Sequence, residues 1–422
     1  MEKFLDEARE KEPLLHTEKT TQDIVIESYL SDLVLTDGYR EEFASLVEDI
    51  PELFYPLDLD LSGLVRRQRE VLLRNYGMER SVHPVMDDDG IETPPPSGRK
   101  WNIRLFLAGF LLFDVTNITR CRQALHREIR SIGEELEELA EHPIDIMDME
   151  SLGKEIGILG EILGRIGYVN YRYAYYPGRS MLPRCGWTLK KINFTYHGED
   201  LLQNLNDRSA VIREALRTMA KSMEEDPELK EAVLGGADYG TVCREFPEVQ
   251  PLFEAFLDKH GYHTERGAYC ITERSYHEDP DRMMRELREI LSREKEEDEI
   301  DGFMRIMYQA KKKLYRGTYQ SFENRTRYLR NFFHLSSDLE YLWETVFFYM
   351  RKVLSRIAYL TTEDPEITHS IGYLTLDEVL EVCRRGSISR EDLNRIIRRT
   401  EKRPYAEKIW AYAKEMILEE PE

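Results

Sequence analysis

Hydrophobic residues recur at helical spacing over most of the chain, and the stretch from residue 244 to residue 291 shows this clearly. Apolar residues repeat every three or four positions from Val249 to Leu257, which predicts a helix with one buried face. We expect this helix to end at Gly261, because glycine can adopt the positive φ that often closes a helix. A second helix is expected after the Glu-Asp-Pro triplet at 278–280, where aspartate can cap a helix and proline suits its first turn.

The first part of the chain also has helical patterns, interrupted by one loop. Residues 1–80 predict two or three short helices, and residues 101–139 predict a long one whose first half is hydrophobic nearly all round and therefore buried. Residues 85–100 combine acidic residues with three prolines, which predicts a Pro-rich loop. Residues 149–170 predict a helix whose repeated glycines let a neighbouring helix or a ligand approach the backbone. These patterns predict a mainly α fold, a helical bundle.

The segment from residue 168 to residue 183 is rich in tyrosine. Alternation between residues 171 and 175 favours short strands, so a small β element is expected near 171–197. A tyrosine ring with its hydroxyl suits an aromatic ligand as well as a subunit interface or plain packing. The predicted substrate-binding residues are Tyr168, Tyr171, Arg172, Tyr173, Tyr175, Tyr176 and Arg179.

Composition narrows the classes of function. The net charge of −21 argues against nucleic acid as a partner, because binding phosphates needs clustered Lys and Arg. Five cysteines are scattered singly, which makes a disulfide framework or a zinc site unexpected. The N-terminus is charged from its second residue, and the apolar run 105–115 is too short to cross a bilayer. We therefore expect a cytoplasmic protein with no membrane partner.

Cations are grouped on two predicted helices of this acidic chain, and guanidinium groups can hold phosphate oxygens bidentately. They are expected to hold a phosphate or a docked partner. The alternative is an ordinary surface with ion pairs to residues such as Glu323, Asp338, Glu340 and Glu344. The predicted docking residues are Arg325, Arg327, Arg330, Arg351, Lys352 and Arg356.

Several segments follow the order and spacing of a known family. They are Phe246-Pro247-Glu248-Val249, Phe256-Leu257, Gly261, Tyr276 and the triplet at 278–280. This layout resembles the middle region of the phosphoenolpyruvate-synthase-like phosphotransferases, closest in pattern to rifampicin phosphotransferase. Residues 323–360 and 371–412 follow in the family's order, and residues 197–202 fit more weakly. The resemblance covers about residues 197–415.

The resemblance implies a division of labour between chains. In that family an ATP-grasp domain phosphorylates a histidine on a mobile domain, and this histidine passes the phosphoryl group onward. The 422 residues contain no glycine-rich phosphate loop and no Gly-Gly-x-x-Ser/Thr-His segment. The implied role is therefore a substrate-binding module that binds no cofactor itself. ATP and Mg are expected on an ATP-grasp subunit, with a phosphohistidine-domain subunit as second partner; phenylphosphate synthase, which divides related modules among subunits, is a parallel.

A group of polar residues surrounds the predicted helix end at 261. His263 stands where the family usually has an arginine, and Gly267 about where it has an acid. A histidine titrates near neutral pH, so His263 is a candidate general base that deprotonates an acceptor hydroxyl. His260 and His263 have poor spacing for a metal across a helix end, and no metal site is predicted.

We expect one of two functions for this chain. The first function is the substrate-binding component of a split phosphotransferase, not catalytic alone, which binds a small organic hydroxyl acceptor, aromatic if the tyrosines line its site. The second is a non-catalytic helical ligand-binding or scaffold protein derived from such a module.

The chain is expected to divide into an N-terminal helical part, 1–190, and a C-terminal part, 191–422, which carries the resemblance.

Overall fold

The structure is a computed structural model of the 422-residue chain. It describes residues 55–75, 85–87, 90–92, 115–192, 194, 198–203, 205, 207–264, 270–292, 302–362 and 368–401. These residues are mainly helical, so the predicted fold class is confirmed. The predictions for residues 1–54 and 93–114 lie outside the described residues. They include much of the predicted Pro-rich loop and the first part of the predicted 101–139 helix.

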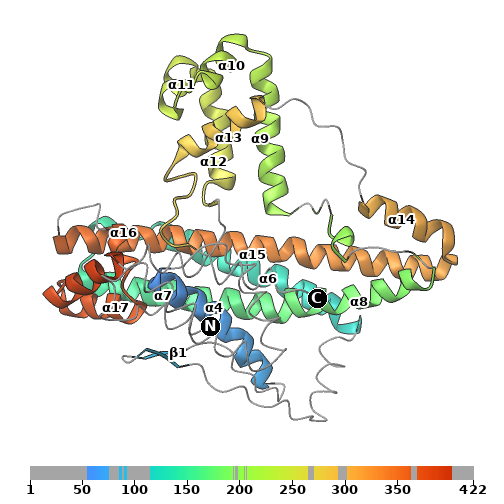
Figure 1. Ribbon diagram of the computed structural model, residues 1–422, viewed down its shortest axis with the longest axis horizontal. Coiled ribbons are helices and arrows are strands. Elements are labelled where there is room, and N and C mark those ends of the chain that lie inside the picture. Colours follow the sequence, from blue (N-terminus) through green and yellow to red (C-terminus); the bar gives the residue numbers. More distant parts are fainter. Residues whose placement is uncertain are drawn as a thin grey trace, which may run out of the picture.

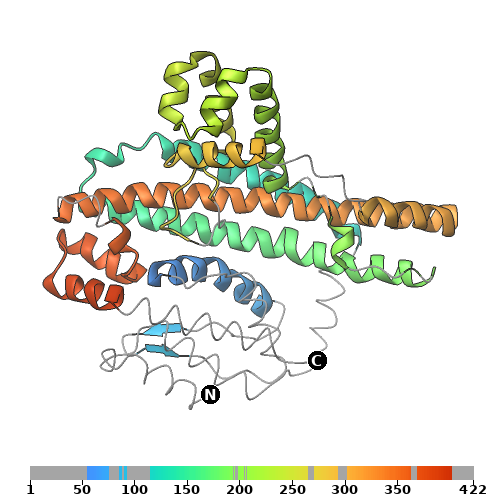
Figure 2. The ribbon, with the colours of Figure 1, turned by 45° about the horizontal axis from the view of Figure 1, so that its top comes forward.

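One long helix organises the molecule. Helix α15 runs from Arg316 to Thr362, a length of ~70 Å at 1.5 Å per residue. Beside it lies a second continuous helical rod of three segments (Figure 2). These segments are α7 (Met149–Val169), the π-helix η3 (Asn170–Tyr175) and α8 (Tyr176–Lys190). Helices α4 (Pro56–Asn75) and α6 (Val115–Ala140) pack against the two rods, and together they form a layer.

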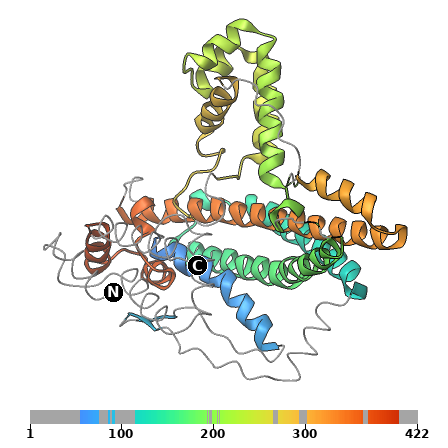
Figure 3. The same ribbon diagram turned by 45° about the vertical axis from the view of Figure 1, so that its right-hand side comes forward.

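A small helical unit stands on one side of this layer (Figures 1 and 3). Its helices are α9 (Arg208–Glu224), α10 (Pro227–Leu234), α11 (Tyr239–Glu245), α12 (Gln250–His260) and α13 (Pro280–Ser292), with the short 3₁₀ turn η5 (Pro247–Val249). Aspartates cap three of these helices: Asp207 accepts from Ala210 N at 2.8 Å, and Asp226 and Asp238 do the same for α10 and α11. The predicted helix start after residue 279 is confirmed by α13.

The described helices have two hydrophobic cores. The larger core joins residues of the layer, such as Leu61, Leu159, Leu189 and Phe347. The smaller core lies within the small unit and contains residues from Ile212 to Leu287. The expected boundary between residues 190 and 191 has members of the larger core on both of its sides, so the cores separate the inserted unit 208–292 from the rest.

The two ends of the layer are closed by different elements (Figure 1). At one end, α14 (Gly302–Lys313) folds back on α15 and contacts the 3₁₀ turn η4 (Gly198–Leu201). At the other end lie α16 (Thr368–Ile371), α17 (Leu376–Arg385) and a helix over 390–401. The turn after α17 uses Gly386, whose φ of 70° lies in the left-handed region that favours glycine.

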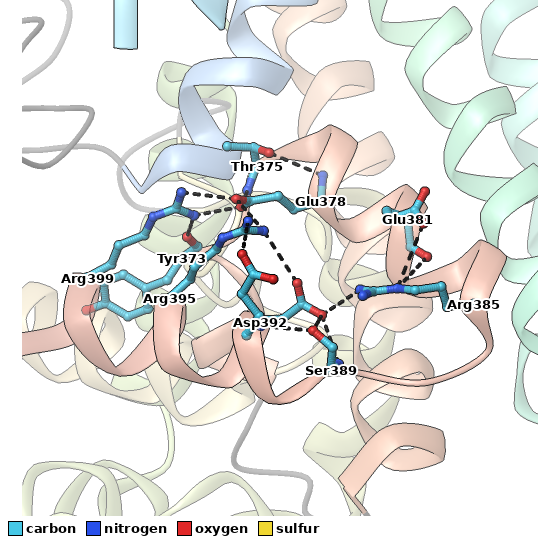
Figure 4. Close-up of polar contacts among 10 residues, drawn as sticks. Tyr373, Thr375, Glu378, Glu381, Arg385, Ser389, Asp392, Arg395 and Arg399 are labelled. Carbon is cyan, nitrogen blue, oxygen red and sulfur yellow. Dashed lines mark hydrogen bonds and ion pairs between the residues drawn. The ribbon is translucent and has the colours of Figure 1, made fainter. Parts of the chain in front are cut away.

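A polar network fastens the helices at the α17 end (Figure 4). Thr375 and Glu378 form a capping box at the start of α17. Arg399 donates to both carboxylate oxygens of Glu378, at 2.7 and 3.1 Å. Burial alone would raise the pKa of Glu378, but the hydrogen bonds and charge of Arg399 outweigh it and hold this pKa below its usual value. Asp392 accepts from Ser389 and Arg385 in the same way.

The expected β element near 171–197 is wrong for the described residues of that range, because 170–190 is helical. The buried positions Ala174, Met181, Cys185 and Leu189 repeat at helical spacing and pack into the larger core, which overrides the alternation of tyrosines. The only strands among the described residues are β1 (Val85–Asp87) and β2 (Gly90–Glu92), an antiparallel pair inside the predicted loop. Among the described residues, no helix is long and apolar enough to cross a membrane.

Candidate functional site at the junction of the small unit and the long helix

A non-helical segment joins the small unit to the layer. We call residues 261–264 and 270–279, which lie between α12 and α13, the strap. The strap runs along one side of α15 (Figure 3) and makes hydrogen bonds to Glu344 and Arg351 of that helix. Its residues include His263, so the predicted general base lies where the two helical units meet.

His263 is paired with a buried carboxylate. Its Nδ1 lies 3.0 and 3.1 Å from the two carboxylate oxygens of Glu344. Glu344 is only 3% exposed and also accepts from the backbone N and the hydroxyl of Thr264, both at 3.4 Å. A carboxylate beside Nδ1 favours the tautomer of the neutral ring that carries its hydrogen on Nδ1, and this leaves Nε2 to accept a proton. The side chain of His263 is 17% exposed.

Arg282 fixes the backbone of the same residue. Its Nη1 donates to the carbonyl of His263 at 3.4 Å, and its Nε donates to Glu286 at 3.0 Å. The guanidinium also lies 4.3 Å from the ring centre of Tyr276, whose hydroxyl donates to Glu286. Ring and backbone of His263 are thus both held by buried partners.

A bidentate ion pair fastens the end of the strap. Arg351 donates to Glu278 through Nε at 2.8 Å and through Nη2 at 2.6 Å. Glu278 also accepts from the backbone and hydroxyl of Ser275. Burial opposes the charged form of Glu278, but Arg351 and Ser275 outweigh it and lower the pKa of this carboxyl. The Glu278 carboxylate therefore stays ionised at neutral pH.

Aromatic side chains of the strap pack against those of α15. Tyr262 contacts Phe348 and His277, with ring centres 5.0 Å apart in both cases, and its hydroxyl lies 3.2 Å from that of Tyr349. Burial raises the pKa of Tyr349 and lowers the pKa of His277. Tyr349 and His277 are therefore neutral at pH 7 and serve as packing.

The residues at the end of α12 differ from expectation in one respect. The helix ends at His260 as predicted, but Gly261 has a φ of −61°, so the expected positive φ is wrong. A Cβ at position 261 would lie 2.2 Å from the Nε2 of His277, so glycine is needed there for the close approach of the strap. His260 is buried, and burial followed by the charge of Arg208 lowers its pKa to about 4.

The predicted substrate-binding tyrosines form two small clusters around the π-helix η3. Tyr171, Tyr175 and Tyr176 contact one another, with ring centres 5.3 to 6.4 Å apart. Arg172 lies 5.5 Å from the ring centre of Tyr168 and 5.3 Å from that of Tyr173, and donates to the Tyr168 hydroxyl. These rings are half-buried. The side chain of Arg179 lies outside the described residues.

A proline explains the π-helix. Pro177 lacks a backbone N–H, and its ring clashes with the carbonyl four residues earlier in an α-helix. Immediately before it, Tyr176 N bonds to Tyr171 O, a spacing of five residues, so the wider π turn precedes the proline. Asn170 at its start accepts from Ser336 of α15 at 2.9 Å. Such π turns are frequent at functional sites.

The structure does not bring the predicted docking cations together. Arg325 and Arg351 lie 26 residues apart on the same helix, a distance of ~39 Å. Arg330 donates to the carbonyls of Leu201 and Gln203 and stacks on Phe303. Four of the six docking residues have separate surroundings. Arg327 is exposed and donates to Asn324, and Arg325 is half-buried. Lys352 lies over the ring of Phe348, and Arg356 lies over the ring of Tyr359.

Sequence reasoning missed the partners that hold His263. In the alternative interpretation of the docking cations, Glu344 takes part in a surface ion pair, whereas it is buried and paired with histidine. The signal for this was present: a single glutamate in the apolar run from Leu342 to Met350. Glu278 and Arg282 gave no such signal. Within the described part of the chain, no three His, Cys, Asp or Glu side chains lie close enough to hold a metal ion.

A comparison with known families finds a match for the region that contains the strap. Residues 186–333 match the family model of the rifampicin phosphotransferase fourth domain. This region is similar to rifampicin phosphotransferase. The match spans about a third of the 422 residues, begins inside α8 and ends inside α15, so it contains the whole small unit and the strap. No curated protein matches the chain.

The match confirms the resemblance predicted from the sequence motifs between Phe246 and Pro280. Over residues 186–333 the chain is therefore similar to a domain of a phosphotransferase. Residues 334–360 and the motifs noted at 371–412 lie beyond the matched residues, and these parts of the resemblance stay predictions. Glu344 and Arg351 also lie beyond it, so the matched strap is held by residues outside the match.

Proposed function

We propose that this chain is the substrate-binding component of a phosphotransferase related to rifampicin phosphotransferase. It presents an organic hydroxyl compound, the acceptor, to a phosphohistidine on a separate chain. The observation that carries the proposal is the match of residues 186–333 to a domain of rifampicin phosphotransferase. The sequence printed here has no phosphate loop and no phosphohistidine segment, so ATP, Mg and the phosphoryl donor belong outside these residues, on an ATP-grasp subunit and a phosphohistidine-domain subunit.

In this proposal His263 is the general base. Glu344 accepts from Nδ1, so Nε2 takes the proton of the acceptor hydroxyl as its oxygen attacks phosphorus. The bond between phosphorus and the donor histidine breaks in the same step, and the donor nitrogen keeps the electron pair. Glu344 stabilises the imidazolium that forms, as an orienting carboxylate does in other histidine bases.

The half-buried tyrosines of η3 supply the acceptor site in this proposal. Ser336, which contacts η3, and Glu344, which holds His263, lie eight residues apart on α15. This spacing corresponds to ~12 Å along the helix and about 80° around it. An acceptor that touches both places therefore has to be of polycyclic size. The aromatic rings favour a phenol or a larger hydroxylated aromatic compound.

A pull-down tests the division between chains. The tagged chain is incubated with its native lysate, with the tag alone as control, and the captured proteins are identified by mass spectrometry. We expect to capture an ATP-grasp protein or a phosphohistidine-domain protein. If the lysate contains both proteins but neither is captured, the proposal is contradicted.

Ligand binding tests the acceptor site separately. Phenols and hydroxylated polycyclic compounds are titrated into the purified chain, and binding is followed by calorimetry. We expect Tyr175→Ala to weaken binding at least about tenfold, the effect of ~1.4 kcal/mol for a lost aromatic contact. Tyr359→Ala, a change at an exposed tyrosine of α15, is the matched control and leaves binding unchanged.

One observation favours the second function, a non-catalytic ligand-binding or scaffold protein. Of the predicted docking cations, Arg330 and Arg351 are committed to bonds within the chain. A chain that binds polycyclic compounds but captures neither partner, and whose His263→Ala variant binds them equally well, fits this second function.

A further inference from the structure

The end of the molecule at α14 carries a surface that the proposed function does not use. We call it the tip; it comprises α14 and the turn into α15 (Figure 1). Its exposed residues are Met304, Arg305, Tyr308, Lys311, Lys312, Lys313, Tyr315 and Arg316. This surface combines cations with large apolar side chains.

The apolar residues of the tip are unusually accessible. Tyr315 is 89% exposed, Tyr308 64% and Met304 61%. The inner face of α14 packs into the larger core through Ile306 and Ala310, so the outer face is not needed for folding. Tyrosine, methionine and arginine are enriched at protein interfaces, where an exposed ring becomes an anchor.

Among the described residues, the cations of the tip have no side-chain partner. Arg305, Lys311, Lys312, Lys313 and Arg316 make no side-chain hydrogen bond or ion pair with any residue of the described chain. Five like charges stand here on a chain whose net charge is −21. Like charges at this spacing repel one another, and an acidic surface relieves that repulsion.

The same chain offers such an acidic surface at its other end. Glu134, Glu137, Glu138 and Glu141 at the end of α6 are exposed, and their side chains form no ion pair within the described residues. This end of α6 leads through a short turn to α7, whose Gly153 lies against Cys383 of α17. Helices α17 and α14 lie at opposite ends of the layer (Figure 1). One molecule therefore cannot bring its own tip to these glutamates.

We propose that the tip docks on the acidic end of α6 of a second copy of this chain. Two copies in antiparallel arrangement make the contact twice, once at each end, and the pair is then closed by a twofold axis. Tyr308, Tyr315 and Met304 supply the buried centre of each contact, and the opposite charges align it.

Sedimentation velocity with charge reversal tests the proposal. The wild type is expected to be a dimer at about 50 mM salt and to dissociate at about 500 mM, because salt screens exposed charges. The tip variant Lys311→Glu/Lys312→Glu/Lys313→Glu is expected to be monomeric, as is the α6 variant Glu134→Lys/Glu138→Lys/Glu141→Lys. An equimolar mixture of the two variants restores both contacts and gives a heterodimer.

The matched control reverses three exposed cations of another helix, Arg213→Glu/Arg217→Glu/Lys221→Glu on α9, and leaves the dimer intact. Circular dichroism confirms that each variant folds. A wild type that is monomeric at low salt overturns the proposal, as does a dimer that persists in the tip variant. Binding of a monomeric wild type to vesicles of anionic lipid, lost in the tip variant, overturns it in favour of a lipid surface.

Discussion

At the scale of single residues, buried carboxylates determine how the segments join. Asp58 is fully buried and accepts from the backbone N of Ile271, 213 residues away, at 2.6 Å. Glu155 is buried beside His142, and Glu344 beside His263. A charge is removed from water only where hydrogen bonds replace the water. The sequence shows that such residues sit in apolar surroundings, but it does not show which distant group pairs with each.

Removal of the Glu344 carboxylate tests its place in the junction. Glu344→Ala leaves His263 and Thr264 without an acceptor in a buried position. We expect the free energy of unfolding in urea to fall by about 2 kcal/mol. Glu344→Gln keeps an acceptor oxygen and loses less, and Glu214→Ala, at an exposed position of α9, changes little. An equal loss for Glu344→Ala and Glu214→Ala contradicts the assignment.

Asp60 predicts a dependence of stability on pH. Burial, which outweighs the hydrogen bond from Leu376 N, raises the pKa of Asp60 to about 6 from 3.8. The folded chain therefore binds this proton more tightly than the unfolded chain, so its contribution to stability is lost as the pH rises from about 4 to about 6. The expected loss is about 3 kcal/mol, because the two pKa values differ by about 2.2 and each pKa unit corresponds to about 1.4 kcal/mol.

The variant Asp60→Asn isolates this contribution. It cannot titrate, so the difference in unfolding free energy between the two proteins changes in favour of Asp60→Asn as the pH rises through this window. Urea unfolding at a series of pH values measures it. A difference that stays constant between pH 4 and pH 7 rules out the raised pKa.

At the scale of elements, close packing overrode local pattern twice. The tyrosine alternation predicted strands, yet residues 170–190 continue the helix of α7 because its buried positions face α15. Gly261 was expected for its backbone freedom, yet it is required because the ring of His277 occupies the space of a Cβ. Both errors come from neighbours that are distant in sequence, which a local pattern does not contain.

A pair of glycine substitutions compares a glycine that is required for close packing with one that is not. Gly261→Ala is expected to lower the free energy of unfolding by about 2 kcal/mol, because the new Cβ overlaps His277. Gly317→Ala, in α15 with open space around it, is expected to stabilise by about 0.5 kcal/mol through helix propensity. Thermal unfolding of both variants measures the two changes in stability. A Gly261→Ala variant as stable as the wild type contradicts the close approach of His277.

At the scale of the whole molecule, two cores of different size share one chain. The layer contains the long helices, and the small unit 208–292 has its own core and is held to α15 through the strap. Units with a smaller core open at lower free energy. The bidentate pair of Glu278 and Arg351 connects the two units.

Hydrogen exchange tests this connection. Arg351→Met leaves the Glu278 carboxylate without its partner, and we expect faster exchange in the amides of α12 and α13. The amides of α17 serve as internal control and keep their rates, because they belong to the larger core. Mass spectrometry of the peptides resolves the two groups. Equal acceleration in α17 shows a global loss of stability instead.

The sequence by itself determined the mainly α fold, the helices that end at His260 and begin at Pro280, and the resemblance over the matched region, because these depend on spacing along the chain. Tertiary structure decided the rest. The docking arginines are spread along one 47-residue helix, and the carboxylate that holds His263 comes from 81 residues away. Such pairings are set by which helix faces pack together, and this depends on the burial of the whole core.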